Sequence, residues 1–163
     1  MVDNCKRKHE KEVIVYTDGA SRGNPGTAGI GAVILDTDGS CLTELSEWIG
    51  IATNNEAEYI ALIKGLEAAK GLGAKKVSVY SDSELVVLQM KGVYSVKSPR
   101  LRPLFMKAQI LRSKFTKFEI SHINREKNTH ADMLANIGID SRLDKDNCRP
   151  EQDVDSGRAK VIE

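Results

Sequence analysis

The chain has 163 residues, of which 40% are apolar, and its formal net charge at pH 7 is +1. This length suits one domain with a hydrophobic core, and a charge near zero neither requires nor excludes a polyanionic partner. No window is apolar enough for a membrane span, and Met1 to Glu12 lacks the apolar stretch of a signal peptide, so we expect no membrane association. Cys5, Cys41 and Cys148 are odd in number and lack metal-ligand spacing, which favours a reduced, cytoplasmic compartment.

The first third of the chain predicts three strands. They are expected at residues 13–18, 29–35 and 41–50. The first run is β-branched and aromatic and leads into a glycine-rich segment, 20–26, which reads as a loop. Asp38-Gly39 is a hairpin turn signal between the second and third strands. Strands joined this closely are expected to form an antiparallel meander.

After residue 52 the apolar period becomes helical. Thr53 to Glu56 has the spacing of a capping box, and the helix that follows should end around Gly71-Leu72-Gly73. The later elements alternate between strand and helix, with strands at 77–82 and 118–123 and helices at 83–90, at 101–115 and from Asn128 or Thr129 onward. This alternation implies parallel strands joined by right-handed crossovers, so the sequence predicts an α/β fold.

The two ends of the chain differ in composition from the segment between them. Residues 1–12 are charged and read as a flexible leader. From Arg142 the sequence turns polar, which predicts a C-terminal tail over 142–163, with 159–163 as an edge strand. The folded domain is therefore expected to span 13–141.

Four acids stand out by position. Asp18 and Asp82 each end a predicted strand, Glu58 lies early in the capped helix, and Asp132 lies just inside the last helix. Taken singly, each has a structural explanation as a turn residue, a cap or a first-turn acid. Together they indicate a divalent cation, because clustered carboxylates repel one another and Mg²⁺ prefers oxygen ligands. Two such ions support in-line attack of water on a phosphodiester.

Four motifs carry a resemblance to a known family. They are YTDGASRGNPG at 16–26, TNNEAEY at 53–59, SDS at 81–83 and HAD at 130–132. In this order they resemble type 1 ribonuclease H, in its archaeal and Bacillus-like branch, over about residues 13–140. The resemblance implies a five-stranded mixed sheet flanked by helices and a catalytic domain over 13–141. It also implies cleavage of the RNA strand of RNA/DNA hybrids with two Mg²⁺ or Mn²⁺ ions, leaving 5′-phosphate and 3′-hydroxyl ends. A monomer is the default expectation.

The resemblance assigns roles to individual residues. Asp18, Glu58, Asp82 and Asp132 would be the metal-site acids, and Glu58 would also hold the attacking water near a 2′-hydroxyl, the group that marks the cleaved strand. The expected substrate contacts are Gly19, Asn24, Thr53, Asn54, Asn55 and Ser83. Among these, Asn24 and Asn55 match minor-groove contacts and Thr53 matches a DNA-phosphate contact. The alternative is that residues 53–55 only cap the helix, and both roles can coexist.

The sequence departs from the family pattern in its expected DNA contacts. Ile51 stands where many members have an arginine, which weakens the expectation of a complete DNA-phosphate pocket. Glu84 stands where a substrate-contacting glutamine is common, and an acid there opposes nucleic-acid binding. The basic protrusion of some members is not obvious. Four cations occupy the corresponding region, and they form either a phosphate-facing patch or a solvated face: Lys91, Lys97, Arg100 and Arg102.

Some members use a mobile histidine near the last acid to assist turnover. His122 precedes Asp132 by ten residues but lies in an alternating strand pattern, which favours a structural role. The polar loop 124–128 is similar to that of the branch in which an arginine takes this place, so Arg125 is the candidate. His130 is expected on the surface at the helix start.

Two other functions are alternatives to a nuclease. A phosphotransferase of the actin and sugar-kinase architecture also begins with a strand, an acid and a glycine-rich turn, but this chain is too short for its two domains. A non-catalytic hybrid-binding module is opposed by the retention of all four acids.

Overall fold

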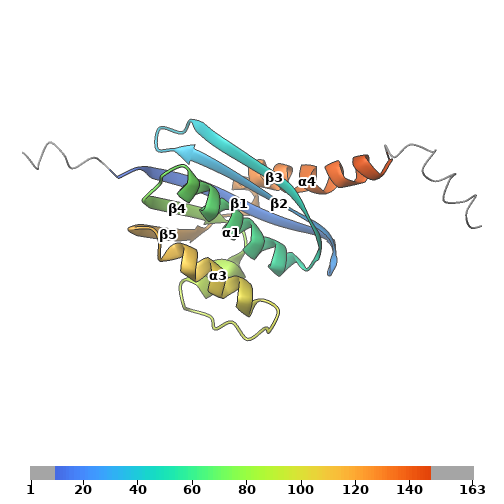
Figure 1. Ribbon diagram of the computed structural model, residues 1–163. Helices are drawn as coiled ribbons and strands as arrows, with labels where there is room; N and C mark the ends of the chain where they lie inside the picture. Colours follow the sequence, from blue (N-terminus) through green and yellow to red (C-terminus); the bar gives the residue numbers. More distant parts are fainter. Residues whose placement is uncertain (1–9, 148–163) are drawn as a thin grey trace, which may run out of the picture.

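The computed structural model describes residues 10–147, which form one mixed sheet with helices on both faces (Figure 1). The strands are β1 (Glu12–Gly23), β2 (Gly26–Asp36), β3 (Cys41–Ala52), β4 (Lys76–Ser81) and β5 (Lys117–His122). Their order in the sheet is β3-β2-β1-β4-β5. The pairs β1–β2 and β2–β3 are antiparallel, whereas β1–β4 and β4–β5 are parallel. The predicted five-stranded mixed sheet is therefore confirmed.

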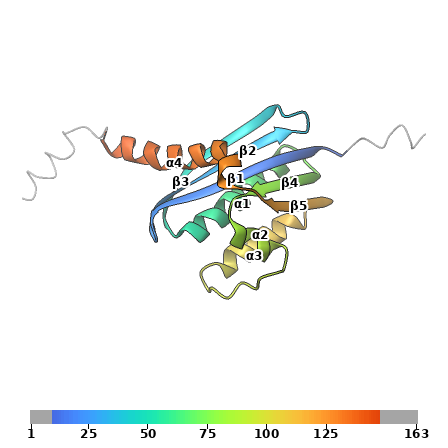
Figure 2. The same cartoon turned by 180° about the vertical axis from the view of Figure 1, so that it is seen from behind.

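Helices cover both faces of the sheet. They are α1 (Asn54–Gly71), α2 (Glu84–Met90), α3 (Arg102–Arg112) and α4 (Thr129–Asn147), with a 3₁₀ turn, η2 (Arg125–Lys127). α1 and α3 lie on one face and α4 lies on the other, as the two opposite views show (Figures 1 and 2). The capping box of α1 is confirmed, because Thr53 Oγ1 accepts from the Glu56 N–H and the Glu56 carboxylate accepts from the Thr53 N–H. Within residues 10–147, no helix has the length and apolarity required to cross a membrane.

The main core lies between the sheet and α1. Alternate residues of the two central parallel strands, among them Val15 and Val79, are fully buried and face Leu62 and Leu66 of α1. Burial of each such aliphatic side chain contributes roughly 1.5–3 kcal/mol, so this layer holds α1 firmly against β1 and β4.

Glycines allow α4 to approach the opposite face closely. A Cβ added at Gly29 would lie 2.5 Å from the Ala135 carbonyl oxygen, and one added at Gly31 would lie 2.2 Å from that of Ala131. Real Cβ atoms do not tolerate such distances, so these positions of β2 require glycine. The contact sets the depth at which the first turns of α4, including Asp132, lie over the sheet.

The predicted loop at 20–26 is wrong. β1 continues to Gly23 and β2 begins at Gly26, so that Ser21 pairs with Ala28 and only residues 24–25 turn the chain. Most of these residues are small and have low strand propensity, but the antiparallel ladder satisfies their backbone groups and overrides that preference.

Both predicted ends of the domain also need correction. Glu12 belongs to β1, and the Lys11 carbonyl accepts a 2.8 Å hydrogen bond from the Lys75 N–H, so the ordered chain begins before residue 13. α4 runs to Asn147 rather than ending near 141, and the Arg142 guanidinium lies 4.7 Å from the centre of the Trp48 ring. The rest of the predicted leader and tail, including the edge strand at 159–163, lies outside the described residues.

Candidate active site

Three acids from three elements converge at one edge of the sheet. Asp18 lies in β1, Glu58 in the second turn of α1, and Asp82 directly after β4. One carboxylate oxygen from each lies within 4.8 Å of those of the other two. Thr17 and Ser81 are paired in the parallel ladder, which places the acids that follow them side by side. The convergence predicted for Asp18 and Asp82 is confirmed.

Gly19 determines how Glu58 reaches the cluster. A Cβ at Gly19 would lie 2.2 Å from the carbonyl carbon of Ala57, so only glycine allows α1 to pack this close to β1. The Gly19 N–H donates a 2.6 Å hydrogen bond to Glu58 Oε1, and the Ser81 hydroxyl lies 3.5 Å from Oε2. The Glu58 carboxylate is therefore anchored by the strand that carries Asp18.

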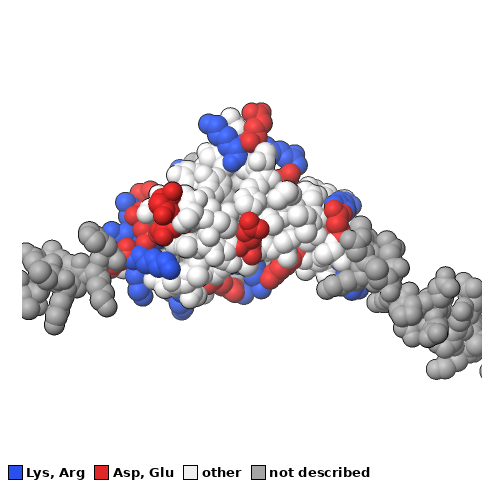
Figure 3. Space-filling model, turned by 90° about the horizontal axis from the view of Figure 1, so that it is seen from above, with Lys and Arg blue, Asp and Glu red and all other residues white. Residues whose placement is uncertain are grey.

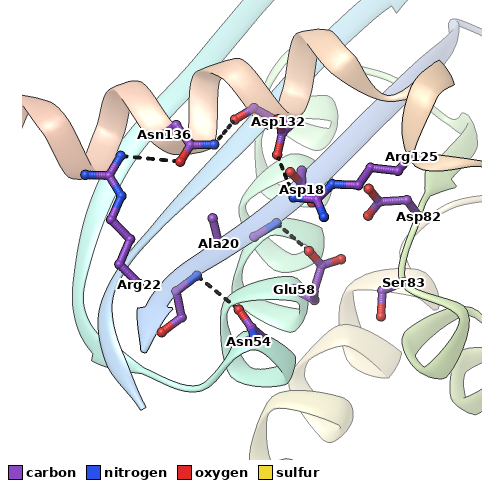
Figure 4. Close-up of a pocket in the computed structure, with 12 residues that line it drawn as sticks. Asp18, Ala20, Arg22, Asn54, Glu58, Asp82, Ser83, Arg125, Asp132 and Asn136 are labelled. Carbon is purple, nitrogen blue, oxygen red and sulfur yellow. Dashed lines mark hydrogen bonds and ion pairs between the residues drawn. The ribbon is translucent and has the colours of Figure 1, made fainter. Parts of the chain in front are cut away.

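Asp132 lines the same cavity but lies outside the group of three. This cavity, of about 480 Å³, also contains Asp18, Glu58, Asp82 and Arg125 in its wall (Figure 4). Asp132 Oδ1 lies 3.7 Å from Arg125 Nη2. All four predicted acids thus face one cavity, with Asp132 supplied by the opposite face of the sheet.

Asn128 is a buried residue of this region that the sequence reasoning missed. Its Nδ2 donates a 2.8 Å hydrogen bond to the Thr17 carbonyl, and its own carbonyl accepts from the Asp132 N–H at 3.1 Å. It is 1% exposed, and its Oδ1 has no hydrogen-bond partner among the described residues. An asparagine directly before a helix is a typical N-cap residue, so the sequence signal suggested only a local role.

Burial and the neighbouring acids shift the pKa values of Asp18 and Glu58. Burial raises the pKa of Asp18 far above its ordinary value, and the charge of Glu58, their shared hydrogen bond and the neighbouring acids Asp82 and Asp132 raise it further. Burial also raises the pKa of Glu58, and the hydrogen bonds from Asp18 and the Gly19 N–H oppose that rise. Without a counter-charge, burial and the neighbouring acids favour the protonated form of Asp18 at neutral pH.

The donor set fits a hard divalent cation. The three clustered side chains offer oxygen ligands alone and lie on separate elements, so they can surround an ion. A bound cation would also stabilise the ionised form of carboxyl groups that burial otherwise disfavours.

The predicted substrate residues divide into two sets. Gly19, Asn54 and Ser83 line the cavity. Asn24, Thr53 and Asn55 do not, and Asn55 is exposed on the first turn of α1. Asn54 Oδ1 accepts from the Ser21 N–H at 3.1 Å, and Asn24 Oδ1 accepts from the Asn54 N–H at 3.2 Å. These two bonds leave the amide NH₂ groups of Asn24 and Asn54 as the donors available to a ligand.

Of the residues weighed for turnover, Arg125 lines the cavity and His122 does not. His122 lies at the end of β5, as its strand pattern predicted, but its side chain is exposed. His130 is exposed and lies 3.0 Å from Glu44, so its expected surface position is confirmed. Ala20, Ser21, Arg22 and Asn136 also line the cavity and were not predicted. A strand extended to residue 23 would have predicted Ala20 and Arg22 from alternation with Asp18.

The cations proposed for a basic region lie outside the cavity. Lys91, Lys97, Arg100 and Arg102 are exposed in or beside the connection between α2 and α3. The Arg100 guanidinium is 3.8 Å from Glu56 Oε1, and because the Arg100 side chain is 64% exposed, this contact contributes little to stability.

Comparison with known proteins places this fold and site in a family. A family model described as "Reverse transcriptase-like" matches residues 16–138. The bifunctional protein Rv2228c of Mycobacterium tuberculosis is 48% identical over 131 residues, which is 80% of this chain and 36% of that protein. The chain thus spans about a third of the length of this relative.

Two solved structures match over nearly their whole length. The crystal structure of RNase H1 from the halophilic archaeon Halobacterium salinarum is 43% identical, with a TM-score of 0.78 over 80% of this chain and 98% of that one. The structure of LC11-RNase H1, solved in complex with an RNA/DNA hybrid, is 48% identical, with a TM-score of 0.77 over 80% and 99%. By its sequence, its sheet order and the acids gathered at the sheet edge, the chain belongs to the type 1 ribonuclease H family.

Proposed function

We propose that this protein is an endonuclease that hydrolyses the RNA strand of RNA/DNA hybrids and leaves 5′-phosphate and 3′-hydroxyl ends. The observation that carries the proposal is the convergence of Asp18, Glu58 and Asp82 from three elements, with oxygens within 4.8 Å of one another, in a cavity that Asp132 also lines. The hybrid bound to LC11-RNase H1 supports the substrate class. We assign the catalytic domain to residues 13–141, together with Glu12 of β1 and the end of α4 up to Asn147. We expect the protein to be a cytoplasmic monomer.

We propose that Asp18, Glu58, Asp82 and Asp132 hold two Mg²⁺ or Mn²⁺ ions. Ions bound there would lower the pKa of a water and stabilise the leaving oxygen in an in-line displacement at phosphorus. The protein contributes four carboxylates on separate elements, because no single helix or strand can surround two ions. It also contributes rigidity, since Glu58 is anchored to the Gly19 N–H.

The residues around the acids suit recognition of an RNA strand. We assign to Glu58 the holding of the attacking water near a 2′-hydroxyl. The amide NH₂ groups of Asn24 and Asn54 can donate to 2′-hydroxyls and to the base acceptors that every base pair presents in the minor groove, so they require no particular sequence. Further contacts are assigned to Gly19, Thr53, Asn55 and Ser83. Arg125, beside Asp132, is assigned to turnover, as a mobile cation that can bind the cleaved phosphate.

A panel of duplexes tests the proposal. Labelled RNA/DNA, RNA/RNA and DNA/DNA duplexes are incubated with the protein in Mg²⁺, Mn²⁺ or chelator. The lengths of the products and the chemical groups at their ends are then determined. We expect metal-dependent cleavage of the RNA strand of the hybrid, lost in Asp18→Asn. Asp36→Asn, at the far end of the β1–β2 pair, is the matched control and should cleave normally. Hybrid binding in Mg²⁺ without product would instead indicate a binding module, and cleavage of DNA/DNA would contradict the substrate class.

A further inference from the structure

Arg22 places a cation in the wall of the cavity, away from the acid cluster. Alternate residues of a strand project to the same side, so Asp18, Ala20 and Arg22 share one side of β1. Figure 4 shows Ala20 and Asn136 between Arg22 and the acids, with Asp82 and Arg125 on the far side. Because the Ala20 side chain is a single methyl group, it leaves the surface between Asp18 and Arg22 open to a ligand.

The Arg22 guanidinium is held in a defined position by α4. Its Nη1 lies 2.7 Å from Asp140 Oδ1, and its Nη2 donates to Asn136 Oδ1 at 3.3 Å. Asn136 Nδ2 in turn donates to the Asp132 carbonyl at 3.0 Å. A guanidinium has five N–H donors in a planar fork, so these two partners leave donors for a further acceptor. Arg22 is thus connected through α4 to the helix turn that carries Asp132.

Stability alone does not account for this arrangement. The side chains of Arg22 and Asp140 are 39% and 56% exposed, and an exposed pair of this kind contributes about 0–1 kcal/mol. On the face seen in Figure 3, cationic and anionic side chains are interspersed among neutral residues. The net charge is only +1, so attraction of a polyanion depends on individually positioned cations rather than on the field of the whole molecule.

We propose that Arg22 binds a phosphate of the cleaved strand, on the side of the scissile phosphate opposite to Arg125. This proposal rests on the proposed function. Four residues of strand span about 13 Å, and phosphates rise about 3.4 Å per nucleotide along a duplex, so the bound phosphate lies within about four nucleotides of the scissile one. Asp140 orients the guanidinium before the substrate arrives, which reduces the entropy lost on binding.

Steady-state kinetics on a hybrid over a range of salt concentrations test the proposal. We expect Arg22→Ala to raise KM about three- to tenfold and to reduce the slope of log KM against log salt by about one, the value for one lost phosphate contact. The kcat should stay within about twofold, because the acids are untouched. Arg22→Lys, which keeps the charge without the fork, should retain the salt slope with an intermediate KM.

The Asp140→Asn variant distinguishes two roles for Arg22, a phosphate contact and a purely structural ion pair. It breaks the same ion pair and loosens the guanidinium, but it leaves the Arg22 charge present and removes a negative charge near the substrate, so KM should rise much less than in Arg22→Ala. If Asp140→Asn and Arg22→Ala raised KM equally, or if both raised KM in step with a lower melting temperature, the pair would be structural and the proposal overturned.

Trimmed substrates locate the contact. A short RNA block inside a DNA strand confines cleavage, and the flanks are then shortened one nucleotide at a time on either side. The wild-type KM should rise at one particular phosphate on one side, and Arg22→Ala should show no rise there. If the wild-type protein cleaves no hybrid, the proposed function fails. If it cleaves and Arg22→Ala has the same KM and the same length profile, only the assignment of Arg22 fails.

Discussion

Asn128 Nδ2 donates a 2.8 Å hydrogen bond to the carbonyl oxygen of Thr17, so the residue that precedes α4 is bound to the residue that precedes Asp18. The two groups are 111 positions apart in the chain and both residues are buried. Because the Asn128 carbonyl also accepts from the Asp132 N–H, one residue links the β1 acid to the α4 acid. The spacing between these two carboxylates is therefore a property of the tertiary fold.

Asn128→Ala should lower both stability and turnover. The change removes the donor to a buried carbonyl, which costs about 1–3 kcal/mol of unfolding free energy, measurable by urea denaturation. It should also reduce kcat, because Asp132 loses its connection to β1. Asn124→Ala, an exposed position just before η2, is the control and should change neither quantity. A variant of Asn128 with wild-type stability and kcat would show that the hydrogen bond does not position Asp132.

Asp18→Asn should stabilise the metal-free protein while it abolishes cleavage. The folded-state pKa of Asp18 lies well above the ordinary value of 3.8, because of burial and then of the charge of Glu58. Between these values the folded protein binds more protons than the unfolded chain, so the wild-type unfolding free energy falls as pH rises.

Melting temperatures measured in chelator from about pH 5 to about pH 8 test this dependence of stability on pH. The wild-type value should fall across the interval, and Asp18→Asn should show a shallower fall and a higher melting temperature at the upper end. Mg²⁺ should restore wild-type stability there, because a cation that binds only the folded protein stabilises it. Parallel curves for the two proteins in chelator would contradict the assigned pKa direction.

Gly19→Ala should be strongly destabilising although it adds one methyl group. The new Cβ would lie 2.2 Å from the Ala57 carbonyl carbon, and a backbone atom of a packed helix cannot move aside without shifting α1. Overpacking of this kind costs about 1–3 kcal/mol or more and should displace Glu58, lowering kcat as well. Gly71→Ala is the matched control: its Cβ would meet nothing within 4 Å, so it should leave stability unchanged or raise it. Equal melting temperatures for both variants would show that α1 can move.

Arg125→Ala should slow turnover without affecting the fold. The side chain is 81% exposed and lies 3.7 Å from Asp132, so its loss should change unfolding free energy by less than about 0.5 kcal/mol. We expect kcat to fall while the metal concentration for half-maximal activity stays the same, and Arg125→Lys should recover part of the rate. Lys127→Ala, an exposed cation in the same 3₁₀ turn, serves as control. A normal kcat in Arg125→Ala would remove this residue from the mechanism.

The sequence alone determined the elements and the identity of the acids. The capping box at Thr53, the alternation in β4 and the helical period of α1 are signals that lie within a few residues of one another, and each predicted its element. The extension of β1 through Ser21 was not predictable in this way, because its small residues have weak strand propensity and pairing with β2 decides their conformation.

Only the tertiary structure decided how the site is assembled. It established that one carboxylate oxygen each of Asp18, Glu58 and Asp82 lies within 4.8 Å of the others, and that Asp132 and Arg22 line the same cavity. It also established that Asn128 binds the Thr17 carbonyl next to Asp18. These relationships depend on how closely α1 and α4 approach the sheet, which Gly19, Gly29 and Gly31 permit. A glycine in the sequence does not reveal which backbone will pack against it. The approach of α1 and α4 to the sheet is therefore decided only when the chain folds.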